Sequence, residues 1–198
     1  MKSNFILILS IFFFFFFFGQ VQRPYTNIKY VVDNQVSNQV KKFASNDSGV
    51  LRNSMFIEVD RNGSPFFNYY KDPLDCYTQT IFSNDTLYIT GHLYGEIGYG
   101  FLIALFNDSC ILTSFAYSDS AIYKFNKSDT SFLAFIPVPS LNQKLVLSET
   151  PSYKDGDIIS GFIELESKEF YYGIKSSELS FRIKLKAHFR TSPLNKSQ

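Results

Sequence analysis

The sequence predicts an all-β protein, an antiparallel β-sandwich of Greek-key or jelly-roll type with about 9–11 strands. Three observations support this. Segments in which apolar and polar residues alternate recur about every 8–12 residues. Asn, Asp, Ser and Gly cluster between those segments, where turns are needed. Finally, the chain holds 13 Tyr and 23 Phe, and aromatic residues favour half-buried pleated surfaces.

The clearest strand is expected over Leu179–Phe189, where every second residue is apolar and the others are mostly Ser, Arg, Lys and His. Met55–Asp60 is a second strand, and the following Asn62-Gly63 supplies the positive φ angles of a tight hairpin turn. Gly95–Gly100 is interpreted as another hairpin turn. The remaining strands are expected at Phe66–Tyr70, Tyr77–Phe82, Thr86–Tyr94, Tyr99–Phe106, Cys110–Tyr117, Ala121–Phe125, Ser131–Ile136, Lys144–Ser148 and Asp157–Glu166.

Residues 1–19 have the three parts of a secretory signal peptide: Lys2 near the start, an apolar run over Phe5–Phe18, and the small residue Gly19. The apolar run is shorter than the roughly 20 residues that a membrane-spanning helix needs. Cleavage near Gly19 is therefore favoured over an uncleaved signal anchor. The mature protein is expected to be exported, to the periplasm, the cell surface or the medium, with no stable membrane span.

The rest of the chain is expected to form one domain, because no linker or internal repeat divides it. Residues 20–50 are a lead-in, residues 51–190 the β-sandwich, and residues 191–198 a flexible tail. Within the lead-in, Val36, Val40 and Phe43 have helical spacing, with Asp33 or Asn34 as the N-cap. A polar loop is the alternative to this short helix.

A modest resemblance covers about a quarter of the chain. The phenylalanine-rich leader ending in Gly19-Gln20 resembles the export signals of Bacteroidota. The stretch Tyr153–Leu165 and the strand Phe181–Phe189 resemble the C-terminal half of uncharacterised exported proteins from that phylum. These are strand and turn patterns, so the resemblance implies export and implies no particular activity.

The charge balance argues against a nucleic-acid partner. Lys and Arg number 19 and Asp and Glu number 18, and loss of the leader removes Lys2, which leaves a net charge of zero. Such a chain gains no long-range attraction to phosphate polymers. The stripe Arg182, Lys184, Lys186, His188 and Arg190 is interpreted as protection of an exposed edge strand, with an anionic phosphate or glycan as the alternative.

Two cysteines, Cys76 and Cys110, are a candidate disulfide, because export would place them in an oxidising compartment. The alternative is a pair of buried free thiols, since the sequence does not place their Cα atoms within reach. With only two histidines, no metal site or cofactor is predicted. The chain is expected not to be an enzyme. A carboxylate-based hydrolase is the alternative, because it needs no histidine.

Two aromatic clusters are the candidate ligand-binding residues: Tyr69 and Tyr70, and Tyr171 and Tyr172. An exposed aromatic patch marks an interaction site. The sequence thus predicts an exported, non-catalytic β-sandwich for adhesion, scaffolding or ligand capture at the cell envelope, with an unknown protein or glycan as its partner. The alternative is a glycan-binding or glycan-cleaving module that uses surface aromatics and carboxylates.

Overall fold

The computed structural model describes residues 27–44, 54–68, 76–83, 85–93, 97–152, 157–174 and 177–192. The leader and residues 193–198 of the predicted tail lie outside these ranges. The prediction of a flexible tail is wrong for its first two residues, because Thr191 belongs to the last strand and both Thr191 and Ser192 are buried. The described chain is an all-β protein with one short helix, α2 (Gln35–Ala44), as the sequence predicts. No helix in the described ranges is both long and apolar enough to cross a membrane.

One large sheet contains eleven strands, antiparallel apart from one short parallel pair. Its main path runs β4 (Ser64–Asn68), β3 (Ser54–Arg61), β14 (Ile183–Thr191), β11 (Ile159–Ser167), β10 (Phe135–Leu147), β8 (Ser109–Ser118), β7 (Ile97–Phe106), β6 (Thr86–Leu93) and β5 (Cys76–Ser83). The short strands β1 (Asn27–Lys29) and β2 (Val31–Val32) pair with β8 and β10. A small sheet contains β13 (Ser177–Phe181), β12 (Phe170–Ile174) and β9 (Tyr123–Lys124).

Strand β10 joins two halves of the large sheet, one made of β4, β3, β14 and β11 and the other of β8, β7, β6 and β5. Its first part, Phe135–Pro139, pairs with β8, and its second part pairs with β11. The register shifts between Ser140 and Asn142, and here the strand changes from one half to the other. Bulges of this kind bend a strand and increase its twist. The all-β antiparallel fold predicted from the sequence is confirmed, and its strands form one large curled sheet with a small second sheet. Strand β10 replaces the separate strands expected at Ser131–Ile136 and Lys144–Ser148.

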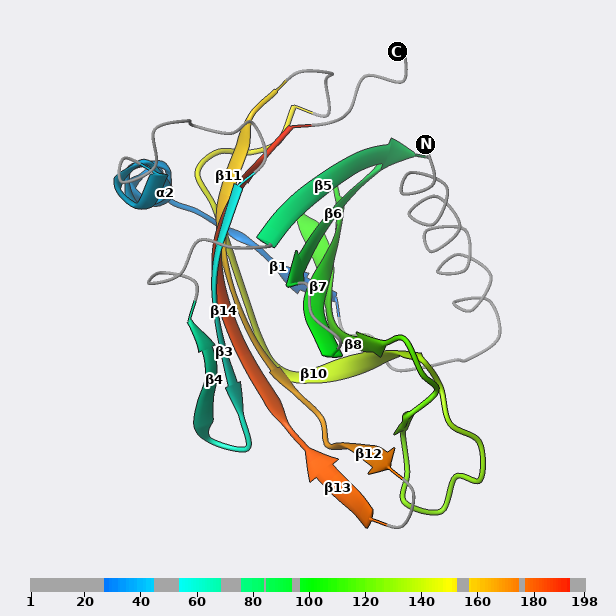
Figure 1. Ribbon diagram of the computed structural model, residues 1–198. Coiled ribbons are helices and arrows are strands. Elements are labelled where there is room, and N and C mark those ends of the chain that lie inside the picture. The colour runs from blue at the N-terminus through cyan, green and yellow to red at the C-terminus, as the bar shows by residue number, and fades with distance from the viewer. Residues whose placement is uncertain are drawn as a thin grey trace, which may run out of the picture.

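The curl brings the β5–β8 half opposite the half made of β3, β14 and β11 (Figure 1). A single large core lies between them, to which both halves contribute fully buried side chains. The rings of Phe101 and Phe189 meet across it at a centroid distance of 5.9 Å. The outer edge of β5 is also joined to β14, since Thr78 Oγ1 donates to the carbonyl oxygen of Arg190 at 3.1 Å.

Four glycines in the large sheet lie directly opposite an aromatic residue on the neighbouring strand. The pairs are Gly91 with Phe101, Gly98 with Tyr117, Gly100 with Phe115, and Gly161 with Phe189. In each pair the ring occupies the space in which a β-carbon would lie, at 1.9–2.4 Å from its ideal position. The interpretation of Gly95–Gly100 as a turn is therefore wrong for Gly98 and Gly100, which lie inside β7 and accommodate rings.

The outer face of the β10–β11–β14–β3 half carries alternating charges. Across these four strands, one row reads Lys144, Glu164, Lys186 and Glu58, and the next reads Asn142, Glu166, Lys184 and Asp60. Glu164 forms ion pairs with Lys184 at 3.6 Å and Lys186 at 3.7 Å. Opposite charges across a ladder stabilise the register by a few tenths of a kcal/mol to about 1 kcal/mol each.

This arrangement corrects the interpretation of the cationic stripe. Strand β14 is not an edge strand, because β3 and β11 flank it on both sides. Its lysines instead balance the charge of acidic residues, which lie opposite them on both neighbouring strands. Arg182 is not part of the stripe, since it falls between β13 and β14.

Helix α2 covers the outer face of the same half, next to the charged rows. The side chain of Asp33 caps it, accepting a hydrogen bond from the backbone N–H of Gln35 at 2.9 Å. Val36 and Val40 are buried against Val146 and Phe162. The predicted helix is thus confirmed, while the side chain of Phe43 lies outside the described residues.

The strand predicted over Leu179–Phe189 is in fact two strands in different sheets. It breaks at Arg182, where the turn between β3 and β4 meets the chain. Asn62 Nδ2 donates to the carbonyl oxygen of Ser180 at 2.9 Å, and Asn62 Oδ1 accepts from the N–H of Arg182 at 2.8 Å. Asn62 and Gly63 also have the positive φ angles, 53° and 79°, that the sequence predicts.

Replacing Asn62 with alanine is expected to lower the free energy of unfolding by about 2–3 kcal/mol. Two hydrogen bonds are lost, at about 1 kcal/mol each, and alanine at positive φ costs about 1 kcal/mol more. Asn62→Gly is the matched control, because glycine removes the same bonds but accepts the backbone angle. Urea unfolding should rank wild type above Asn62→Gly and Asn62→Gly above Asn62→Ala. A glycine variant as stable as wild type would show that the amide contributes nothing.

Candidate functional site: the Arg61 cluster

The structure separates the four predicted ligand-binding tyrosines. Tyr69 and Tyr70 lie outside the described residues. Tyr171 and Tyr172 are neighbours on β12 and therefore project from opposite faces of the small sheet. The hydroxyl of Tyr171 donates to Glu169 Oε2 at 3.1 Å, whereas the ring of Tyr172 packs on Phe181 at 5.4 Å. Of the two described tyrosines, Tyr172 belongs to a larger aromatic cluster.

This cluster surrounds an arginine that the sequence analysis did not select. On β3 the residues Met55, Ile57 and Val59 face the core and are buried. Arg61 continues the same alternation, so its side chain starts from the inner face at the end of the strand. Arg61 is only partly buried. A charged residue at an inner position is unusual, since burying an unpaired charge is costly.

The Arg61 guanidinium lies over two phenylalanine rings. Its central carbon lies 4.2 Å from the centroid of Phe66 and 5.0 Å from that of Phe181. Phe66 falls at the register shift of the β3–β4 hairpin, between Pro65 opposite Asp60 and Phe67 opposite Val59. A bulge re-aims side chains, and the ring of Phe66 packs edge-on against Tyr99 at 5.6 Å. Cation–π contacts of this kind contribute about 0.5–2 kcal/mol each.

Three tyrosines complete the cluster, one from each of three strands: Tyr99 on β7, Tyr123 on β9 and Tyr172 on β12. The Tyr123 hydroxyl donates to the carbonyl oxygen of Tyr117 at 3.3 Å. The Tyr99 hydroxyl is fully buried. Burial raises the pKa of Tyr99, and a side-chain hydrogen bond with Arg61 together with its positive charge opposes that rise. We call Arg61, Phe66, Tyr99, Tyr123, Tyr172 and Phe181 the Arg61 cluster.

The rim of the Arg61 cluster is apolar and exposed. Phe66 is 41% exposed, and Leu179, which pairs with Tyr172 across the small sheet, is 53% exposed. Within the described residues, no carboxylate forms an ion pair with Arg61. The arrangement therefore places one guanidinium over two phenylalanine rings and beside phenol groups, next to an exposed apolar patch of surface. A planar guanidinium matches the two oxygens of a carboxylate or phosphate.

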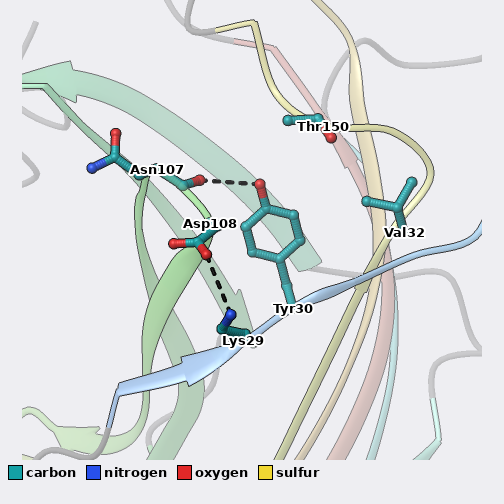
Figure 2. A pocket seen from close by; sticks show the side chains of 6 residues that line it. All are labelled: Lys29, Tyr30, Val32, Asn107, Asp108 and Thr150. Atoms are coloured by element: carbon teal, nitrogen blue, oxygen red, sulfur yellow. Dashed lines mark hydrogen bonds and ion pairs between the residues drawn. The ribbon is translucent and has the colours of Figure 1, made fainter.

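A second candidate is an open hollow of about 450 Å³ near the start of the described chain (Figure 2). Its polar groups already bind one another. Lys29 pairs with Asp108 at 3.6 Å, with both side chains largely exposed, and Tyr30 Oη donates to the carbonyl oxygen of Asn107 at 3.1 Å. Since these contacts use the groups that would hold a ligand, the hollow is a weaker candidate than the Arg61 cluster.

The structure does not support the candidate disulfide. Cys110 is a buried free thiol, and burial raises its pKa to about 12. The side chain of Cys76 lies outside the described residues, but its backbone starts β5, which β6 and β7 separate from β8. Three strand spacings amount to about 14 Å, while a disulfide needs Cα atoms within about 7 Å.

Groups that could hold a metal ion or perform acid–base chemistry are not brought together in the described ranges. They contain no cluster of three or more His, Cys, Asp and Glu side chains suited to a metal. The ring of His92 packs 5.0 Å from that of Phe115, and burial lowers the pKa of His92 to about 4. The carboxylates of Glu58 and Glu164 lie on either side of Lys186 on the outer face of the sheet.

Comparisons with protein-family models, with curated proteins and with solved structures gave no match to this chain. Support for the candidate site therefore comes from its geometry alone. One sequence signal for it exists. In the segment Met55–Arg61, Arg61 has the same parity as the apolar residues, so the alternation places a cation at an inner position. The bulge that turns Phe66 toward Arg61 has no comparable signal.

Proposed function

We propose that this protein is an exported, non-catalytic binding domain that captures a ligand or partner at the cell envelope through the Arg61 cluster. The observation that carries the proposal is the Arg61 guanidinium, which lies over the rings of Phe66 and Phe181 beside an exposed apolar rim. Apolar patches of this kind mark interaction sites, and exposed aromatic and arginine side chains dominate binding energies. The signal-peptide pattern of residues 1–19 supports export.

Envelope binding by the mature chain tests this proposal. The chain without residues 1–19, carrying a fluorescent label, is expected to bind isolated envelopes of the source cells in a saturable manner. Leu179→Ser is expected to weaken that binding about tenfold, because it removes an apolar contact from the rim. Leu141→Ser is the matched control, since Leu141 is 50% exposed on β10 and lies outside the cluster.

Two results would contradict the proposal. The first is an equal loss of envelope binding in Leu179→Ser and Leu141→Ser, which would show that general surface hydrophobicity is responsible. The second is recovery of the full-length chain from the cytosolic fraction with residues 1–19 intact. N-terminal sequencing of the protein from fractionated cells distinguishes that outcome from cleavage near Gly19.

A glycan-binding module is the second candidate function. The exposed ring of Phe66 at the rim of the Arg61 cluster favours it, because aromatic faces suit the apolar faces of sugar rings. Glycan cleavage receives less support, because the described carboxylates of Glu58, Glu164 and Glu166 lie on a sheet face among lysines and an amide.

A further inference from the structure

We infer that the apolar run of the leader, Phe5–Phe18, packs on the outer face of the β5–β8 half of the large sheet while residues 1–19 remain attached. Cleavage near Gly19 then uncovers an uncharged aromatic surface. The inference is independent of the Arg61 cluster. It depends on the composition of this outer face, on its burial, and on the place where β1 joins the sheet.

The outer face of the β5–β8 half carries no charge over most of its described length, in contrast to the rows of Lys and Glu on the other half. Its residues are those that alternate with core residues along each strand. We call the outward-facing residues of four ranges the uncharged face. These ranges contain no Asp, Glu, Lys or Arg, and they are Tyr88–His92, Gly98–Ala104, Ile111–Tyr117 and Phe135–Pro139.

Rings pack together on the uncharged face. The ring of Phe115 lies 5.0 Å from that of His92, 5.5 Å from that of Phe135 and 6.2 Å from that of Tyr117. These residues come from β6, β8 and β10. The face is therefore suited to an apolar layer.

The uncharged face is buried, although it points away from the core. Thr113 is 0% exposed and Phe115 is 1% exposed, and their partners across the ladder, Leu102 and Gly100, lie on the same outer side. Burial also lowers the pKa of His92 to about 4. An outer sheet face that water reaches does not bury its side chains so completely. A further layer of chain therefore covers it.

The described helix and the small sheet pack elsewhere. Helix α2 contacts β11 and β14, and Figure 1 shows it beside β11, on the other side of the curled sheet from β5–β8. The small sheet contributes Tyr123, Phe170 and Phe181 to the inner core. The covering layer thus comes from residues outside the described ranges.

The path of the chain into β1 leads from this face. Asn27 lies opposite Ile111 on β8, and the two strands are antiparallel, so the chain before Asn27 comes from the direction of Thr113 and Phe115. Pro139 of β10 already occupies the pairing position beside Thr113, and the core fills the inner side. Eight residues, 19–26, separate the apolar run from β1 and can span about 26 Å. Phe115 is only about 13 Å along β8 from Ile111.

The Thr113 hydroxyl indicates that the covering layer is apolar. Its Oγ1 atom is buried and has no hydrogen-bond partner in the described structure. A polar segment would bring donors or acceptors to this position. The run Phe5–Phe18 has Ser10 as its one polar residue, whereas residues 45–53 and 69–75, which are also outside the described ranges, include charged residues. The leader is therefore the segment whose composition fits.

Titration of the histidine rings by NMR tests the inference. The full chain, made in a cell-free system without signal peptidase, is compared with the chain that lacks residues 1–19. We expect the pKa of His92 to stay near 4 in the full chain and to rise by at least one pH unit in the truncated chain, because water then reaches the ring. His188 is the internal control. It lies on the outer face of the other half, beside Gln39 and Phe162, and should titrate alike in both chains.

Thr113→Asp in the full chain gives a second measurement. The new carboxylate would be buried beneath an apolar segment without a partner, which is costly, so the leader is expected to detach and the pKa of His92 to match that of the truncated chain. Thr113→Val is the matched control and should keep the pKa of His92 near 4. If Thr113→Asp fails to fold, the comparison of the two unsubstituted chains still decides the matter.

Three results would overturn the inference. The first is an equal pKa of His92 in the full and truncated chains. Sedimentation then shows whether a second copy covers the face, as a dimer of the truncated chain, or another segment does, as a monomer. The second is aggregation of the full chain while the truncated chain stays monomeric, which means that the phenylalanine run is free. The third is an equal effect of Thr113→Asp and Thr113→Val on His92. None of these results bears on envelope binding through the Arg61 cluster.

Discussion

Gly100→Ala is expected to lower the free energy of unfolding by about 3 kcal/mol, at the upper end of the usual cost of overpacking. A β-carbon at Gly100 would lie 2.3 Å from the carbonyl oxygen of Gly91 and 2.3 Å from the ring of Phe115. The Gly91 oxygen belongs to the backbone of β6, so relieving the contact requires a movement of the ladder between β6 and β7. Urea unfolding of the purified mature chain measures the effect.

Gly173→Ala is the matched control for this experiment. There the new β-carbon would meet the ring of Phe132 at 2.6 Å, but Phe132 is 39% exposed and its ring can move into solvent. We expect a loss below about 1 kcal/mol. Similar losses at Gly100 and Gly173 would contradict the view that the close approach of β6 to β7 makes glycine necessary in β7.

Tyr123→Ala is expected to cost about 3–5 kcal/mol, the range for removing a large buried aromatic side chain. Tyr123 is fully buried, and its ring packs on Phe170 at 5.9 Å and Tyr172 at 6.0 Å. These contacts lie within the small sheet, while Tyr123 also belongs to the main core and its hydroxyl reaches the Tyr117 carbonyl oxygen on β8 of the large sheet. Thermal unfolding measures the global loss, and hydrogen exchange in β12 and β13 should increase more than exchange in β6 and β7.

Tyr123→Phe separates the ring from the hydroxyl. It keeps the packing and removes only the hydrogen bond to the Tyr117 carbonyl oxygen, so we expect a loss of about 1 kcal/mol. The interpretation of Tyr123 as the link between the sheets fails if Tyr123→Ala leaves exchange in β12 and β13 at the wild-type rate.

Local signals predicted the parts of the fold that depend on local interactions. Met55–Asp60, Thr86–Tyr94 and Cys110–Tyr117 match β3, β6 and β8 closely, because alternation reports which side of a strand faces a core. Asn62-Gly63 was predicted as a tight turn because few other pairs accept two positive φ angles.

Features that depend on distant neighbours were not predictable in the same way. The alternation over Leu179–Phe189 continues through Arg182, yet the strand breaks there because Asn62, far away in the sequence, bonds the backbone on both sides. The glycines of β7 were interpreted as turn residues, because the sequence does not show that the rings of Phe115 and Tyr117 lie opposite them. The lysines of β14 were interpreted as protection of an edge strand, because the sequence does not show that acidic residues lie opposite them on both neighbouring strands.

The candidate site was predictable only in part, because it too depends on residues that are distant in the sequence. The aromatic composition pointed to Tyr172, which does belong to the Arg61 cluster. Arg61 was identifiable only by its parity, and the rings that surround it come from β4, β7, β9, β12 and β13. Strands so far apart in the sequence come together only once the sheet has curled and the small sheet has packed on its end.

The position of β14 has a consequence for biosynthesis. This strand is made after every other described strand, yet it pairs with β3, which is made more than 120 residues earlier, and with β11. Until the ribosome has added Ile183–Thr191, one half of the sheet lacks an interior member, so that half cannot complete its fold before then. Contacts between such distant residues also slow folding. A nascent chain held open in this way would be compatible with the proposed export, because secretory translocation channels accept unfolded polypeptide.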